Sequence, residues 1–199
     1  MRQGKVERNT KETRILVELD LDGTGKADIS TGVGFLNHML TLLAVHSFMD
    51  LKVRAQGDLE VDCHHTVEDV GIALGQAIAQ ALGDKKGIHR YGSFLLPMDE
   101  ALAEIALDFS GRPYLVWNAD LIPRVTLGNF DTEMGEDFFR ALAMNCGLTL
   151  HINVPYGKNT HHMLEAIFKG VARAMSQAVA LDPRVHGVLR CNGACRNGG

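Results

Sequence analysis

The chain has 199 residues, of which 46% are hydrophobic and 22% charged, and its formal net charge is −4 at pH 7. That length allows one domain or two small ones with a sizeable core. An acidic balance without a block of basic residues argues against nucleic acid as a partner. We find no apolar run near the ~18 residues of a membrane helix, and the N-terminus lacks the apolar segment of a signal peptide.

The four cysteines lack the spacing of a disulfide framework, which fits a reducing cytoplasm; they are Cys63, Cys146, Cys191 and Cys195. We therefore expect a cytoplasmic protein without a membrane or nucleic-acid partner. Cys191 and Cys195 have no partner pair nearby that would complete a metal site. A Gly/Asn-rich tail without a metal is the better interpretation of that segment.

In the first half, apolar and polar side chains alternate through residues 13–30, on both sides of a turn at Asp22-Gly23. This pattern predicts a strand–turn–strand unit. Residues 34–48 change to helical spacing, and residues 51–63 return to strand alternation. A second helix is expected from Thr66, as its N-cap, to Leu82, with Gly83 as the stop signal.

The second half repeats this order. Residues 93–121 predict strands, with Pro97 and Gly111-Arg112-Pro113 as punctuation. Residues 135–146 predict a helix, residues 148–157 a strand, and residues 163–180 a helix that ends before Asp182-Pro183.

The sequence His-His-x-x-Glu occurs twice, at His64 and again at His161, each time at the start of a helical stretch. Laid in register, the two stretches also share Ala, Gln and Ala further along, and His38 then lies over Asp137. This self-similarity predicts a tandem duplication of residues 1–88 and 89–185, followed by a tail of residues 186–199. Each half is expected to be an α+β unit whose helices pack on one face of a small sheet.

On a helix, residues three and four apart share a face, so each motif can present two imidazoles and a carboxylate. Such donors suit Mn, Fe, Zn, Co or Ni, whereas Ca and Mg prefer oxygen ligands. A single copy is usually an exposed helix start, but two copies at equivalent places favour a metal site. Structural zinc prefers four closed ligands rich in cysteine, so a histidine-rich site with open positions indicates catalysis.

Several segments in order along the chain carry a resemblance to a known family; they are VERNTKET (6–13), GVGFLNHML (32–40), VDCHHTVEDVGIALGQA (61–77), RYGSFLLPMDEAL (90–102), DFSGRPYL (108–115) and YGKNTHHMLEAIFK (156–169). They resemble imidazoleglycerol-phosphate dehydratase of histidine biosynthesis. The resemblance implies an internally duplicated α+β fold of the ribosomal protein S5 domain 2-like type. It also implies two Mn²⁺ ions per active site and a 24-subunit assembly with active sites at subunit interfaces. The implied reaction converts D-erythro-imidazole-glycerol phosphate to imidazole-acetol phosphate and water.

The resemblance also implies residue roles. It makes metal ligands of His38, His64, His65, Glu68, Asp137, His161, His162 and Glu165. Asp137 stands where many members have a histidine and others a carboxylate. Glu12 resembles the catalytic acid/base, and His46 a catalytic contact to the substrate. The phosphate-binding residues are then Arg90, Arg112, Lys169 and, in a tail that departs from the family pattern, Arg190.

Two other classes of function stay open on the residues alone. Two metals with arginine and lysine also suit a dinuclear phosphatase, which would release inorganic phosphate. A non-catalytic metal-binding or storage assembly would bind metal without turnover.

Overall fold

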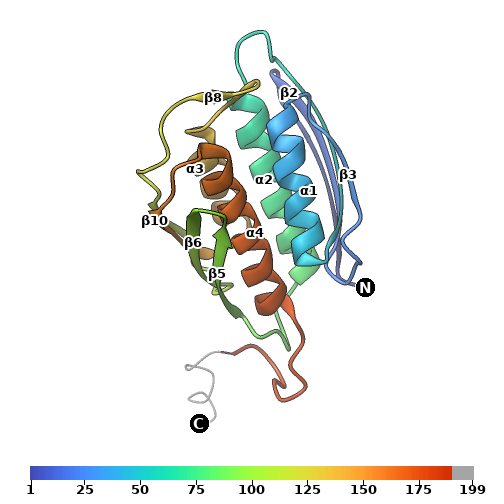
Figure 1. Cartoon of the computed structure of the whole chain (residues 1–199). Coiled ribbons are helices and arrows are strands. Elements are labelled where there is room, and N and C mark those ends of the chain that lie inside the picture. Colours follow the sequence, from blue (N-terminus) through green and yellow to red (C-terminus); the bar gives the residue numbers. More distant parts are fainter. Residues whose placement is uncertain (190–199) are drawn as a thin grey trace.

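The structure, a computed structural model, describes residues 1–189. Two four-stranded sheets form its outer layers, and four helices fill the space between them (Figure 1). The buried side chains of both halves form one continuous hydrophobic cluster. Each half therefore relies on the other to cover its helices. The α+β class with helices on one face of each sheet, predicted from the sequence, is confirmed.

The first half contains four strands and two helices in the order β1 (Gln3–Asn9), β2 (Thr13–Asp20), β3 (Ala27–Ser30), α1 (Gly34–Ser47), β4 (Asp50–Gly57) and α2 (His64–Leu82). Its strands lie in the sheet order β1-β2-β4-β3.

The second half runs β5 (Tyr91–Met98), β6 (Ala101–Asp108), β7 (Tyr114–Asn118), β8 (Thr126–Leu127), β9 (Phe130–Asp131), α3 (Met134–Cys146), β10 (Thr149–Tyr156) and α4 (Thr160–Val179). Its sheet order, β5-β6-β10-β7, matches the first sheet strand for strand, and the β8–β9 hairpin is an insertion. The shared topology supports a duplication. The domain limits at residues 88/89 and 185/186 stay predictions.

Equivalent residues make equivalent contacts in the two halves. A Cβ added to Gly4 or to Gly92 would lie 2.0 or 1.9 Å from a helix carbonyl oxygen, so only glycine lets these strands approach α2 and α4. The next backbone amide in each strand donates to a helix glutamine, at 3.1 Å in the first half and 3.0 Å in the second. The helix carbonyls belong to Ala77 and Ala174, the glutamines are Gln80 and Gln177, and the sequence alignment pairs these same residues.

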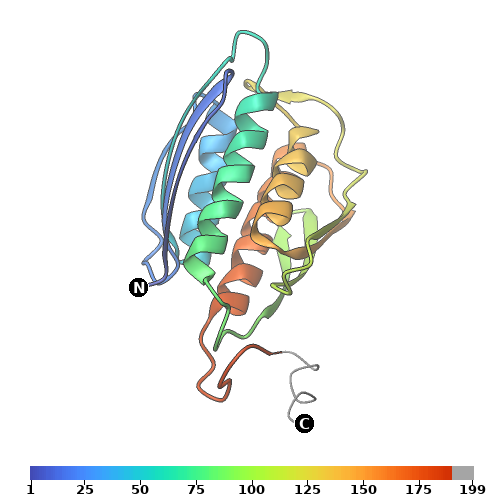
Figure 2. The same ribbon diagram turned by 180° about the vertical axis from the view of Figure 1, so that it is seen from behind.

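All four helices begin at the same end of the molecule (Figure 1). Helix α1 packs against α4 on the face seen in Figure 1, and α2 packs against α3 on the opposite face, seen in Figure 2. The two histidine motifs therefore start at the same end but on different faces. None of the helices within residues 1–189 combines the length and apolar character that a membrane crossing requires.

Strand β1 was not predicted from the sequence. Its inward positions include Gly4, which has no side chain, and its outward positions are polar or charged, so its alternation is weak. Glu12, expected directly before the first strand, lies instead in the turn between β1 and β2.

The expected strand–turn–strand unit is wrong in its pairing, because β4 lies between β2 and β3. The Asp50 carboxylate explains the path. It accepts hydrogen bonds from the backbone amides of Thr24 and Lys26, at 2.7 and 2.9 Å, and so ties the loop after β2 to the start of β4. The chain then continues past β4 to its far side.

Two smaller predictions are also wrong. Helix α2 begins at His64 and not after Thr66, because the Asp62 carboxylate accepts from the His64 amide at 2.7 Å. Thr66 is instead buried within the first turn. Pro97 lies inside β5, which is an edge strand and so tolerates a residue without an amide hydrogen.

Candidate metal centre

Three side chains that can hold a metal ion converge between α1 and α4. The donor atoms of His38, His161 and Glu165 all lie within 4.8 Å of one another. Glu165 Oε2 is 3.1 Å from His161 Nε2 and 3.6 Å from His38 Nε2. Within residues 1–189, no other three such side chains lie this close. Two imidazoles and a carboxylate fit a transition metal and leave coordination positions for further ligands.

Glu165 is the buried member of this group, with 7% of the residue exposed. Burial by itself would raise the pKa of its carboxyl group. A hydrogen bond from Lys169, four residues along α4, and the charges of Lys169, His38 and His161 all lower this pKa. Together they outweigh the effect of burial, so the pKa of Glu165 lies below its usual value. The carboxylate is thus ionised at neutral pH, as a metal ligand must be.

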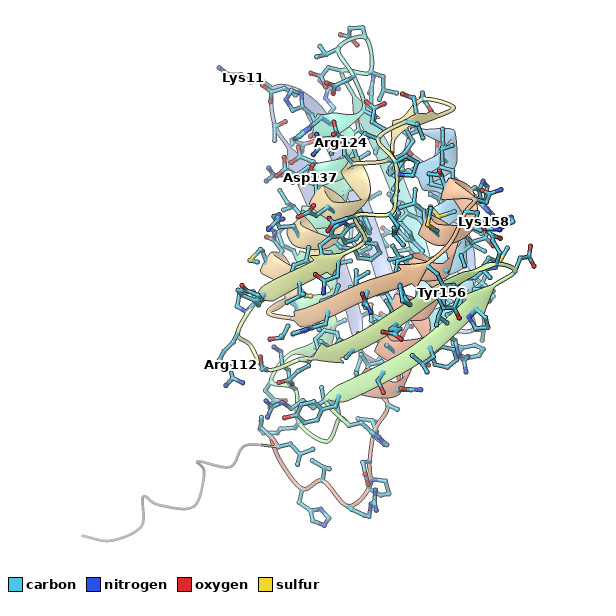
Figure 3. The ribbon with its side chains drawn as sticks, turned by 60° about the vertical axis from the view of Figure 1, so that its left-hand side comes forward. Lys11, Arg112, Arg124, Asp137, Tyr156 and Lys158 are labelled. Carbon is cyan, nitrogen blue, oxygen red and sulfur yellow. The ribbon has the colours of Figure 1, made fainter. Side chains whose placement is uncertain are left out.

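The first-half counterpart of this group lies on the opposite face, on α2 and α3. His64 Nε2 and Glu68 Oε2 are 3.6 Å apart, the same i,i+4 pair as His161 and Glu165. Asp137 lies in the first turn of α3, where the alignment pairs it with His38 (Figure 3). The structure therefore does not bring the two motifs together within one chain. It divides the predicted ligands between two faces.

The second histidine of each motif is held by a carboxylate. His65 Nδ1 lies 2.9 Å from Asp58 Oδ2, and His162 Nδ1 lies 2.8 Å from Glu100 Oε2. A carboxylate accepts hydrogen bonds, so Nδ1 is the donor in both rings and Nε2 stays available to a metal. These hydrogen bonds raise the pKa of both imidazoles, and the bond from His162 holds the pKa of Glu100 at about 2.

The start of α4 is fixed by its neighbours. The Asn159 side chain caps the helix and accepts from the amides of His161 and His162 at 2.9 and 3.3 Å. The Glu100 carboxylate in turn accepts from the amides of Lys158 and Asn159 at 3.1 and 2.6 Å. Sequence reasoning missed these residues, although aligning the two hairpins as well as the two helices would have singled out Glu100.

Glu12, the predicted acid/base, sits in a turn that a hydrogen-bond network holds. The Thr10 hydroxyl accepts from the amides of Glu12 and Thr13, at 3.1 and 2.9 Å, and lies 3.2 Å from the Thr13 hydroxyl. The Thr13 hydroxyl donates to buried Asp69, which also accepts from Arg8 Nε at 2.9 Å. The network fixes the backbone of Glu12 and leaves its side chain exposed.

We expect Asp69→Ala to lower the free energy of unfolding by roughly 1–3 kcal/mol, because it leaves the Thr13 hydroxyl and the Arg8 guanidinium without their acceptor. Urea unfolding at one fixed protein concentration measures the change. Asp28→Ala is the control, because it removes an exposed carboxylate paired with Arg54 and should change stability by less than about 1 kcal/mol.

The second half supplies a sharper comparison, because apolar residues occupy the equivalent places: Leu96, Ala101 and Ala166, all buried. Transferring that trio to the first half, as Arg8→Leu/Thr13→Ala/Asp69→Ala, removes the Asp69 carboxylate together with the two side chains that donate to it. It should therefore be less destabilising than Asp69→Ala alone. A triple variant that is the less stable of the two would contradict this interpretation of the network.

The predicted phosphate-binding residues lie in two separate places. Arg90 makes two hydrogen bonds to Asp108, at 2.6 and 2.9 Å, and Arg112 is 4.0 Å from the same carboxylate. Lys169 instead pairs with Glu165 on α4. The backbone carbonyl of Arg112 accepts a hydrogen bond from the Thr149 hydroxyl at the start of β10. Because α4 follows the other end of this eight-residue strand, Arg112 is about 25 Å from the start of α4. Figure 3 shows Arg112 and Lys158 well apart. Arg190 lies outside the described residues.

His46, the second predicted catalytic residue, lies two helical turns after His38 on α1. Burial and the charges of Lys169 and Arg173 hold the pKa of its imidazole below the usual value. It is therefore neutral at pH 7 and can accept a hydrogen bond or a proton.

Comparison with known proteins gives a consistent result. The sequence model of the family "Imidazoleglycerol-phosphate dehydratase" matches residues 31–175. The imidazoleglycerol-phosphate dehydratase of Lactococcus lactis subsp. cremoris is 58% identical to this chain, over 96% of the chain and all of the relative. The enzyme of that name from Paracoccus denitrificans is 61% identical, over 95% of the chain and 96% of the relative.

Two solved structures share the fold. Imidazoleglycerol-phosphate dehydratase from Staphylococcus aureus superimposes with a TM-score of 0.82 and 44% identity, covering 90% of this chain and 99% of that one. The Pyrococcus furiosus enzyme, solved in complex with (S)-C348, gives a TM-score of 0.75 and 36% identity, covering 92% of this chain and all of that one. The resemblance seen in the sequence motifs is confirmed, and the chain belongs to the imidazoleglycerol-phosphate dehydratase family.

Proposed function

We propose that this chain dehydrates D-erythro-imidazole-glycerol phosphate to imidazole-acetol phosphate in histidine biosynthesis, at a site holding two Mn²⁺ ions. The observation that carries the metal site is the convergence of His38, His161 and Glu165 between α1 and α4. Its first-half counterpart is His64, Glu68 and Asp137, and His65 and His162 add one imidazole to the ligands of each motif. As a carbon–oxygen lyase of amino-acid biosynthesis, the protein would work in the cytoplasm.

We further propose that one active site takes its ligands from more than one copy of the chain. The helices that carry the two ligand groups begin at the same end of the molecule, but α1 and α4 lie on one face and α2 and α3 on the opposite face (Figures 1 and 2). Each group also leaves coordination positions that another copy can fill. A homo-oligomer of 24 subunits, which the family resemblance implies, would join the α1–α4 face of one subunit to the α2–α3 face of another.

The reaction needs a base outside the metal ligands. No carbonyl group adjoins the C–H bond that is broken, so the substrate does not acidify that proton itself. Bound metal ions supply Lewis acidity and a template for the imidazole ring. Glu12 lies on an exposed turn and takes the C–H proton. The neighbouring hydroxyl group leaves with a proton as water, and the enol that remains becomes the ketone. Neutral His46 contacts the substrate as a hydrogen-bond acceptor, and it is the second candidate for proton transfer.

The phosphate group is assigned to Arg90, Arg112, Lys169 and Arg190. Arginine binds phosphate through paired, charge-assisted hydrogen bonds. Because Arg90 and Arg112 lie about a strand's length from the start of α4, residues of different copies would have to meet around one substrate. Arg112 is the most available of the described three, since 80% of its side chain is exposed.

We expect Arg112→Ala to raise KM about 10- to 100-fold, which corresponds to losing a charged hydrogen bond of ~1.5–3 kcal/mol, while the metal content stays the same. Arg124→Ala is the matched control, because Arg124 is also an exposed loop arginine and pairs with Glu133. If the KM of Arg112→Ala equals that of Arg124→Ala, Arg112 is an ordinary surface cation and does not bind the substrate phosphate.

One assay separates this function from its alternatives. Metal-loaded protein is incubated with the substrate, and the ketone product and inorganic phosphate are measured together. Dehydration yields the ketone and leaves the phosphate ester intact. Release of inorganic phosphate would instead indicate a phosphatase, and bound metal without any product would indicate a metal-binding assembly.

A further inference from the structure

Glu12 and Glu100 occupy the same position in the two halves. Gly92 lies 88 residues after Gly4, and both make the same close approach to a helix carbonyl. Strands β2 and β6 begin at Thr13 and Ala101, again 88 residues apart. In this register Glu100, the residue before β6, is the counterpart of Glu12, the residue before β2.

The two glutamates have different surroundings. Glu100 accepts hydrogen bonds from His162 Nδ1 and from two backbone amides at the start of α4. Within residues 1–189, the Glu12 carboxylate makes no hydrogen bond and no ion pair, although its charge acts on His65. The same ancestral position thus orients a histidine in the second half and is unpaired in the first.

Asp58, in the loop between β4 and α2, holds His65 in the way that Glu100 holds His162, so Glu12 does not need to make this contact. The Oδ2 atom of Asp58 lies 2.9 Å from His65 Nδ1, which is the contact that Glu100 makes with His162. Its other oxygen, Oδ1, is buried and has no hydrogen-bond partner among the described residues. Burying an oxygen without a hydrogen-bond partner costs free energy. The only side-chain hydrogen bond of Asp58 among the described residues is the one to His65, so we take orienting His65 to be the role of this side chain.

We infer that Asp58 is a positioning residue: it orients His65 for metal binding in place of the first-half glutamate and thereby leaves Glu12 available for proton transfer. Glu100 is the corresponding positioning residue for His162. The inference rests on the proposed metal site and assigns roles to two residues outside its ligand set. It also explains why the two halves place their carboxylates differently around otherwise equivalent helix starts.

The test is a double-mutant cycle on metal affinity, read by competition of the metal-free protein with a chelating dye for Mn²⁺. Asp58→Ala should weaken Mn²⁺ binding about 10- to 100-fold, as expected for loss of a partner that orients a ligand. Asp58→Asn keeps an oxygen acceptor for His65 Nδ1 and should weaken Mn²⁺ binding less than Asp58→Ala does. Glu60→Ala is the control: it removes an exposed carboxylate from the same loop and should leave the Mn²⁺ affinity unchanged.

The decisive comparison is the effect of Glu12→Gln in the parent protein and in the Asp58→Ala variant. In the parent protein, Glu12→Gln should leave Mn²⁺ affinity unchanged. In the Asp58→Ala background, Glu12 can turn to His65 as Glu100 does to His162, so adding Glu12→Gln should weaken binding by about a further tenfold. Thermal unfolding of the metal-free variants checks that all of them fold.

Failure of the role given to Asp58 can be told apart from failure of the proposed function. If the parent protein binds Mn²⁺ and Asp58→Ala binds it equally well, or if the two substitutions act independently, the role given to Asp58 is overturned while the metal site stands. If the parent protein binds no divalent metal at all, the proposed function fails and this inference fails with it.

Discussion

Glu12→Gln should lower turnover by ~10²–10⁴-fold, the range typical of a lost general base. The Glu12 carboxylate is exposed, makes no hydrogen bond within residues 1–189, and belongs to neither ligand group. A neutral side chain of the same shape therefore disturbs neither the core nor the metal ligands. The variant should fold, assemble, bind both metals and still bind substrate through the metals and the phosphate contacts. The measurement is steady-state kinetics on protein of verified metal content.

Glu7→Gln is the matched control, because Glu7 is an exposed glutamate on the adjoining strand β1, and its turnover should stay close to that of the parent. A loss of only a few-fold in Glu12→Gln, with metal occupancy confirmed, would move the proton transfer to another group. His46 is the next candidate, because the pKa of its imidazole is lowered by burial and by neighbouring cations and the ring is neutral at pH 7.

Metal removal should abolish turnover and also break up the assembly. The ligand groups lie on two faces of the chain, and metal bound between copies would hold those faces together. Without metal, the imidazoles and carboxylates of neighbouring copies would lose their common partner. Size-exclusion chromatography with light scattering, before and after EDTA, measures the change in particle mass.

Glu68→Gln is an informative companion to chelation, because it alters the α2 ligand group and leaves the Glu165 group intact. It should bind less metal and assemble less completely than the parent at equal Mn²⁺. A particle mass that stays unchanged after verified loss of metal would show that other contacts hold the copies together.

The sequence predicted the fold well where the patterns were strong. Helical spacing and the repeated His-His-x-x-Glu motif located α1, α2, α3 and α4, and strand alternation located β2, β6 and β10. It missed β1, where glycine occupies an inward position. It also paired β2 with β3, because adjacency along the chain does not reveal that the Asp50 carboxylate carries the loop across β4.

The candidate site was predicted in its residue types but not in its arrangement. The duplicated motif identified His161 and Glu165, and the alignment with α3 drew attention to His38. Spacing on separate helices cannot show that α1 packs against α4. The orienting residues Asp58 and Glu100 were missed because each is isolated in a turn or loop, and only the folded chain brings it to a histidine.

The most direct measurement is a titration of metal-free protein with Mn²⁺, in which bound metal per chain and the rate of ketone formation are followed together. If two ions per active site, one site per chain, support dehydration, the rate should reach its maximum only as binding approaches two Mn²⁺ per chain. Metal-free protein should be inactive. Full turnover by the metal-free chain, or a rate that is already maximal at one bound ion per chain or fewer, would contradict a two-metal dehydratase built from the duplicated motif.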